Sequence, residues 1–262
     1  MNRRGDAKYN WGIVLVLNLY FAEINEVIIC MLGKTTSYGQ FCPVARAAEI
    51  IATRWTPILL RELFAGSTKF NDLRNGVPLM SPSLLSKRLN ELEKAGVITK
   101  KKPEKGRGWE YLITDSGKEL WPIVETLGVW GQKFILSEFE KHELDPTLLM
   151  WDIHRRIDCE KFPPDGCFTA HFTLRDAPAE RVVWWLVIKD RKVDLCIHDP
   201  GHETSLYVVA CLKPLTDIWM GRMEIDRAIQ TKDLILSGEM KYVKSFSQWF
   251  LLSPFAEHSN RR

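Results

Sequence analysis

The chain has 262 residues, of which 45% are apolar and 26% charged, enough for one large domain or two ordinary domains with buried cores. The formal net charge of +3 indicates little, but Lys and Arg outnumber Asp and Glu by 15 to 10 in residues 37–137, whereas Asp and Glu lead by 20 to 17 in residues 138–262. This distribution places the basic excess in the middle of the chain, and the mildly acidic C-terminal half has no charge that would favour nucleic acid.

Residues 1–37 are interpreted as an N-terminal extension. Residues 11–32 are largely apolar, but polar and acidic side chains interrupt them, namely Asn18, Glu23, Asn25 and Glu26. We therefore do not expect a membrane span. Because Met31 begins a run typical of an ordinary protein start, two hypotheses stay open for residues 1–30: an upstream extension absent from the native protein, or an added dimerisation helix.

Three short helices are predicted ahead of the central motif. The first follows Cys42-Pro43 and covers about residues 44–53. The second covers residues 58–64, and helical spacing directs its leucines, Leu59, Leu60 and Leu63, toward a core. The third covers residues 69–73.

The most informative segment is residues 80–114, which is interpreted as a helix, a turn and a basic hairpin. Ser81 is a good N-cap, and Pro82 suits the first helical position because its missing N–H is not needed there. The helix runs to residue 95, with an apolar face formed by Leu85, Leu89 and Leu92. Short polar and basic groups suit phosphate oxygens and base edges, and the candidates are Ser81, Ser83, Ser86, Lys87 and Asn90, with Arg88 on the same side or flanking it.

The hairpin that follows Gly96 is basic at its tip. Strands are predicted at residues 97–99 and 109–114. Between them a single acid, Glu104, accompanies five cationic residues: Lys100, Lys101, Lys102, Lys105 and Arg107. Such a tip suits the phosphate backbone or a minor groove. Helix, glycine and basic hairpin in this order predict a winged helix-turn-helix whose first helical turns enter the major groove of double-stranded DNA.

A long amphipathic helix is predicted after the wing, capped at residues 114–117 and kinked near Pro122. A domain this small cannot bury the whole apolar side of such a helix. A second copy of the chain would cover it, and a two-fold dimer matches two DNA half-sites one turn apart. The alternative is that the helix packs on the C-terminal domain.

The pattern changes after a charged linker, assigned to residues 138–149. Strands are predicted at residues 167–174, 182–188, 193–198, 205–211 and 233–238, and helices at 215–220, 222–230 and 242–252. Strands followed by helices predict an α+β domain at residues 150–255, with a tail at 256–262. The winged helix domain is assigned to residues 38–137, so the fold class of the whole chain is α+β.

Motifs for catalysis and metal binding are absent from the sequence. The six cysteines lack CxxC and zinc-finger spacing, which favours a reduced, cytoplasmic environment. The six histidines lack HExxH spacing, and nucleophile-elbow and phosphate-loop patterns are missing. The cluster His198-Asp199-Pro200-Gly201-His202 is interpreted as a turn. We therefore expect no enzyme activity, no cofactor and no metal.

Several motifs, taken in order, resemble the HxlR-type transcriptional regulators over about residues 38–137. The residues that carry the resemblance are Cys42-Pro43-Val44, Arg54 to Leu59, Lys69 to Leu73, Met80 to Leu89, Leu92 to Gly96, and Trp109-Glu110-Tyr111 with Leu112, Thr114 and Gly117. The resemblance implies a homodimeric winged-helix DNA-binding protein of bacterial type.

The same resemblance raises a question about Cys42, because the cysteine at this position is a thiol sensor in some members of that family. A cysteine ahead of a helix can have a lowered pKa and be reactive, but Pro43 removes one N–H that would help. We favour a buried packing cysteine and keep the sensor as an alternative.

The C-terminal segment, about residues 150–255, resembles the sterol carrier protein type 2 fold. The residues that carry the likeness are Ser205 to Cys211, Trp219-Met220-Gly221-Arg222, the helix around Ala228, and Leu236-Ser237-Gly238-Glu239. The likeness implies a sheet covered by helices around an apolar pocket for a lipid-like or other hydrophobic molecule. Candidates for the lining are Trp184, Trp185, Trp219, Met220 and Trp249. We expect most of them to pack in the core, with Trp184 and Trp185 on opposite faces of a strand.

Together these observations predict a cytoplasmic transcriptional regulator that binds double-stranded operator DNA as a homodimer. A hydrophobic small molecule in the C-terminal domain would modulate DNA binding, and no membrane partner is expected. Two alternatives stay open. One is a redox-sensing regulator switched at Cys42, and the other is a hydrophobic-ligand carrier whose winged helix serves only protein contacts.

Overall fold

The computed structural model describes residues 37–104, 106–135 and 138–259. The hypotheses for residues 1–30 and the DNA contact predicted at Lys105 therefore lie outside the described residues. The chain divides into two compact units, Met1–Thr56 and Pro57–Arg262. In the first unit, helix α2 (Pro43–Ile51) confirms the helix predicted after Cys42. Among the described residues, no helix combines the length and the apolar character needed to cross a membrane.

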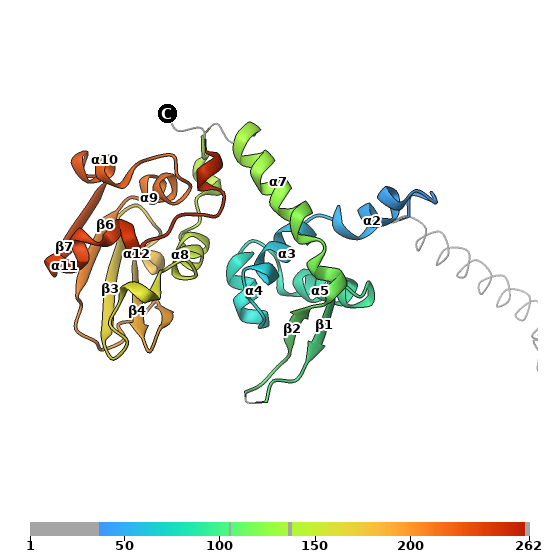
Figure 1. The fold of residues 1–262 in the computed structure, drawn as a ribbon, viewed down its shortest axis with the longest axis horizontal. Coiled ribbons are helices and arrows are strands. Elements are labelled where there is room, and N and C mark those ends of the chain that lie inside the picture. The colour runs from blue at the N-terminus through green and yellow to red at the C-terminus, as the bar shows by residue number, and fades with distance from the viewer. Residues whose placement is uncertain (1–36, 105, 136–137, 260–262) are drawn as a thin grey trace, which may run out of the picture. The chain divides into compact units, whose positions relative to one another are not determined.

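The second unit begins with a helix-turn-helix (Figure 1). Its helices are α3, which starts at the unit boundary (Thr56–Phe64), α4 (Phe70–Gly76) and α5 (Pro82–Lys94). The leucines predicted to face the core are buried, and Leu73 of α4, which was not predicted, is buried as well; the predicted six are Leu59, Leu60, Leu63, Leu85, Leu89 and Leu92. This core fixes the side of α5 that faces inward, so the opposite side of α5 is left to solvent.

The predicted hairpin is confirmed as β1 (Ile98–Lys101) and β2 (Glu110–Ile113). The two strands pair antiparallel, with Ile98 opposite Ile113 and Lys101 opposite Glu110. The N–H of Tyr111 also donates to the carbonyl of Thr68 at 2.8 Å, which ties the hairpin to the segment before α4. The hairpin projects from the helices next to α5 (Figure 1).

The prediction of one long helix after the wing is wrong, because two helices stand there. Thr114 caps a short helix, α6 (Asp115–Lys118), by accepting the N–H of Gly117 at 3.1 Å. A second helix, α7 (Trp121–Phe134), then begins with Pro122 in its first turn. Proline has no N–H to donate, so it fits the start of a new helix better than the interior of a continuous one.

The linker predicted at residues 138–149 is partly helical. A 3₁₀ turn covers Lys141–Glu143, and Asp145 caps α8 (Pro146–His154) by accepting the N–H of Leu148 at 2.8 Å. Helix α8 packs against α4 and β5, so the C-terminal half starts earlier than predicted and joins the helix-turn-helix directly.

The C-terminal half contains a mixed five-stranded sheet, as an α+β fold requires. Its strands are β3 (Cys167–Leu174), β4 (Val183–Lys189), β5 (Lys192–Cys196), β6 (Leu206–Ala210) and β7 (Leu234–Gly238), in the order β5-β4-β3-β6-β7. The central pair, β3 and β6, is parallel, and the other pairs are antiparallel. All five strands lie close to the predicted ranges.

The helices of this half are α9 (Leu212–Trp219), α10 (Ile225–Gln230), α11 (Met240–Lys244) and α12 (Phe246–Trp249). Short 3₁₀ turns cover Cys159–Lys161, Ala179–Arg181 and Ala256–His258. The prediction of a single helix at residues 242–252 is wrong, because the helix is interrupted at Ser245. The hydroxyl of Ser245 donates to the carbonyl of Lys241 at 2.8 Å. The predicted tail is packed at least to Ser259, whose hydroxyl donates to the carbonyl of Gly221 at 2.7 Å.

One face of the sheet and the helices over it enclose the core of the C-terminal half. Trp184 pairs with Phe172 across β4 and β3, and both side chains are buried. Trp185 points to the other face, where the centres of its ring and of the His171 ring lie 5.2 Å apart. The predicted alternation of the two tryptophans is therefore confirmed.

Candidate nucleic-acid interface

Helix α5 presents a row of short polar side chains to solvent. The hydroxyl of Ser81 accepts the N–H of Leu84 at 3.3 Å, which confirms the predicted cap. The predicted contact residues Ser81, Ser83, Ser86, Lys87 and Asn90 are all exposed. A capped helix with its polar side free at the first turns has the form that fits a major groove.

The two basic residues of this row differ in their surroundings. The side chain of Lys87 is 67% exposed and lies 4.0 Å from Glu91. The side chain of Arg88 is 15% exposed and is ion-paired with the same glutamate. The side chain of Lys87 thus extends into solvent, whereas that of Arg88 flanks the polar row and is held along the helix.

The basic residues of the wing also differ in their surroundings. Lys100 forms an ion pair of 2.8 Å with Glu93 of α5, and this hydrogen bond raises the pKa of Lys100. Lys101, Lys102 and Arg107 are exposed. Lys100 therefore fastens the wing to the helix, whereas Lys101 is paired within the hairpin, with Glu110 at 3.8 Å, and keeps a side chain that is 60% exposed.

The sequence interpretation missed Trp109, which lies between the tip of the wing and the start of β2 and is 44% exposed. The ammonium groups of Lys100 and Lys102 lie 5.6 and 5.8 Å from the centre of its ring. Such cation–π contacts hold long lysine side chains in place. Its position directly after a basic turn was the signal that could have identified it.

Cys42 occupies the N-cap position of α2 and is half-buried, with no hydrogen bond from its side chain to the helix. These contacts do not separate a sensor from a packing residue, so the redox switch stays a prediction. Within the described ranges no three His, Cys, Asp or Glu side chains gather as a metal site would need.

The tryptophans predicted to line an apolar pocket do not converge on one cavity. Trp184 and Trp249 are buried in the core, and the indole N–H of Trp184 donates to the carbonyl of Arg181 at 2.8 Å. Trp185 faces the opposite side of the sheet. Trp219 and Met220 do share a cavity, which lies at the end of α9 and not inside the sheet-and-helix core.

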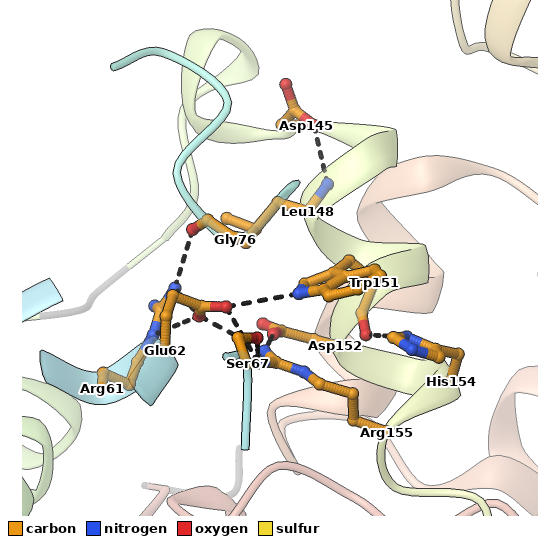
Figure 2. Close-up of polar contacts among 10 residues, drawn as sticks. All are labelled: Arg61, Glu62, Ser67, Gly76, Asp145, Leu148, Trp151, Asp152, His154 and Arg155. Atoms are coloured by element: carbon orange, nitrogen blue, oxygen red, sulfur yellow. Dashed lines mark hydrogen bonds and ion pairs between the residues drawn. The ribbon is translucent and has the colours of Figure 1, made fainter. Parts of the chain in front are cut away.

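A buried glutamate joins the helix-turn-helix to α8 (Figure 2). The side chain of Glu62, in α3, has no exposed surface. Its two carboxylate oxygens accept hydrogen bonds from Arg155 at 2.8 and 3.3 Å, and the indole of Trp151 donates to one of them at 3.3 Å. Arg61 donates to Glu62 at 2.7 Å and to the carbonyl of Gly76 at 3.0 Å. A charge this deep is tolerated only with such partners.

Gly76, at the end of α4, makes room for this carboxylate. A Cβ at this position would lie 1.8 Å from Oε2 of Glu62, far inside contact distance. The glycine is therefore required by the packing of Glu62 and not by a turn.

His154 lies in the last turn of α8, next to this cluster. Its Nδ1–H donates to the carbonyl of Trp151, and its ring lies 4.3 Å from the indole. Burial lowers the pKa of His154 to about 4, and the nearby Arg155 adds to that effect. His154 is therefore neutral at pH 7.

The chain is similar to known regulators over the helix-turn-helix segment. The model of the HxlR-like helix-turn-helix family matches residues 50–139. The uncharacterized HTH-type transcriptional regulators YvaP and YdeP of Bacillus subtilis (strain 168) are 34% identical over 103 residues and 36% identical over 109 residues. The matches cover 38% and 39% of this chain, and 95% and 83% of those relatives. A solved structure, the redox regulator HypR in its reduced form, matches 34% of this chain and 90% of its own at 30% identity, with a TM-score of 0.33.

Removing the partner of Glu62 should destabilise the second unit. Arg155→Met leaves a buried carboxylate with less compensation, so we expect the free energy of unfolding to fall by about 3 kcal/mol in urea denaturation. Adding Glu62→Gln to that variant should recover much of the loss. The control is Lys118→Met, which breaks an ion pair between exposed side chains, Lys118 and Asp115, and should change stability little. An equal loss of unfolding free energy in Arg155→Met and in Lys118→Met would contradict the role of Glu62.

Acid should weaken the fold through His154. Because the folded-state pKa of about 4 lies below the ordinary value of 6.5, the unfolded chain binds the proton first as the pH falls. The free energy of unfolding should therefore drop between pH 6.5 and 4, by up to about 3 kcal/mol, and this contribution is absent above pH 6.5. His154→Gln should remove that part of the slope, whereas the exposed His142→Gln should retain it. A slope unchanged by His154→Gln would disprove the assignment.

Proposed function

Because the chain belongs to the HxlR-like helix-turn-helix family, we propose that it is a transcriptional regulator that binds operator DNA as a homodimer. The observation that carries the proposal is the exposed polar row of α5 beside a basic wing, in one compact unit. Ser83, Ser86 and Lys87 would contact base edges and phosphates in the major groove. Lys101, Lys102 and Arg107 would contact the backbone or the minor groove alongside.

The dimer is proposed from the exposed apolar side of α7. Ile123, Leu127, Trp130 and Phe134 are between 42% and 72% exposed. Their spacing of three or four residues places them on one side of the helix. A second copy packed on this side would remove the apolar surface from water, and two-fold symmetry would place two α5 helices on successive half-sites.

The C-terminal half is proposed to hold the effector site. A mixed sheet covered by helices is the arrangement that the sterol-carrier resemblance implies, and it supports a role in binding a small molecule with apolar surface. An effector can shift DNA binding only if it has different affinities for the DNA-competent and incompetent states. Helix α8, which contacts α4, provides a physical connection between the two halves.

The first test separates base readout from phosphate contact. Operators are identified by genomic footprinting of the tagged protein, and affinity is then measured by fluorescence anisotropy at several salt concentrations. Lys87→Ala should weaken operator binding by about tenfold or more. Lys101→Ala should weaken binding to every duplex and reduce the salt slope by about one. The matched control, Arg227→Ala on exposed α10, should change neither.

Two outcomes would contradict this function. Unchanged affinity in both lysine variants would remove α5 and the wing as the interface. The absence of any salt-dependent DNA affinity would favour the carrier protein instead.

The second test concerns the dimer. Trp130→Glu places a charge on the apolar side of α7, so sedimentation equilibrium should show a shift from dimer to monomer and a weaker affinity for two-half-site DNA. Ile229→Glu, at a similarly exposed isoleucine in α10, is the control and should leave the dimer intact. A dimer that persists in Trp130→Glu would place the interface elsewhere.

A further inference from the structure

A cavity of about 470 Å³ lies where α3 and the first turn of α7 meet α8, α9 and the segment at residues 253–255. Its apolar wall contains the rings of Phe64, Trp121 and Trp219. Phe64 and Trp121 pack edge to face with their ring centres 5.1 Å apart, which gives this wall a fixed form. The volume suits a small organic ligand, and such sites favour the junction between domains.

Another part of the lining is cationic. It contains Arg61, Arg155 and Arg156 against a single acid, Asp152. Asp152 is ion-paired with Arg155, so its charge is already partnered. Arg156, whose side chain is exposed, donates its Nε–H to the carbonyl of Leu252 at 3.2 Å, and among the described residues its two terminal nitrogens make no other hydrogen bond.

We propose that this cavity binds an amphipathic monocarboxylate, with its aromatic or alkyl body against Phe64, Trp121 and Trp219 and its carboxylate against the arginine wall. Arginine presents paired N–H groups that match the two oxygens of a carboxylate. Arg61 and Arg155 already donate to Glu62, so Arg156 is the arginine of this wall that a ligand carboxylate would engage first. The site therefore differs from the interior of the sheet-and-helix core, which aromatic side chains fill.

The position of Arg155 connects this cavity to the helix-turn-helix. The same guanidinium that lines the cavity also holds Glu62 of α3. A ligand carboxylate that accepts hydrogen bonds from Arg155, or that lies beside it on Arg156, would weaken the attraction between Arg155 and Glu62, which links α3 to the end of α8. Ligand binding would in this way alter how firmly α3 is held. This regulatory consequence rests on the proposed DNA-binding function, whereas the binding of the carboxylate does not.

The test is isothermal titration calorimetry of the full chain with three probes: 2-naphthoate, biphenyl-4-carboxylate and decanoate. We expect at least one probe to bind at submillimolar concentration, and the neutral 2-naphthamide to bind at least tenfold more weakly. Arg156→Gln should weaken the carboxylate at least tenfold and leave the amide unchanged. Arg227→Gln, at an exposed arginine outside the cavity, is the matched control and should bind like the wild type.

A second variant, Ala65→Trp, fills the cavity from the end of α3 and should abolish binding without removing any arginine. The proposal is wrong if none of the three carboxylates binds, or if both Arg156→Gln and Ala65→Trp bind them as the wild type does.

Operator affinity measured with and without the bound probe tests the connection separately. A change of about fivefold or more is expected. A carboxylate that binds in the cavity but leaves operator affinity unchanged would contradict the connection through Arg155. A chain that binds the carboxylate but no DNA would overturn the proposed function and leave the cavity assignment standing.

Discussion

The carboxylate of Glu62 has no contact with water, and a charge in that position must be offset by groups fixed around it. Those groups come from separate parts of the chain: Arg61 from the same helix, Trp151 from α8, and Arg155 from the C-cap of α8 (Figure 2). The helix that carries Glu62 also supplies leucines to the core beneath α5. The placement of the exposed polar side of α5 and the start of the C-terminal half therefore depend on the same ion cluster.

The elements that the sequence predicted well are those with local signals. Helix α5 has a serine cap, a proline at its first position and leucines at helical spacing, so its bounds follow from residues within a few positions of each other. The cap at Thr114 was predicted, but the break between α6 and α7 was not, because the apolar spacing continues across residues 119 and 120 and periodicity alone does not detect a second helix start there. The linker was mispredicted for a related reason: Asp145 and Pro146 suit both a loop and a helix start, and contact with α4 decides between them.

The interface shows the same division. Composition predicted a basic wing, but it could not separate Lys100 from Lys101, because Lys100 pairs with Glu93 on α5 whereas Lys101 pairs with Glu110 inside the hairpin. The large aromatics of the C-terminal half were correctly expected to pack mainly in the core, but the cavity beside α9 could not be foreseen. Its walls come from segments about 190 residues apart in sequence, and such proximity has no local signature.

The dependence of Glu62 on Arg155 also bears on how such chains can be assembled from parts. A helix-turn-helix segment with a buried glutamate at this position is not an independent module that accepts any second domain, because an incoming domain without a cation there would leave the carboxylate undercompensated. Exchange of C-terminal domains between related chains is therefore constrained to donors that bring an arginine at this place, or to recipients that have first lost the acid.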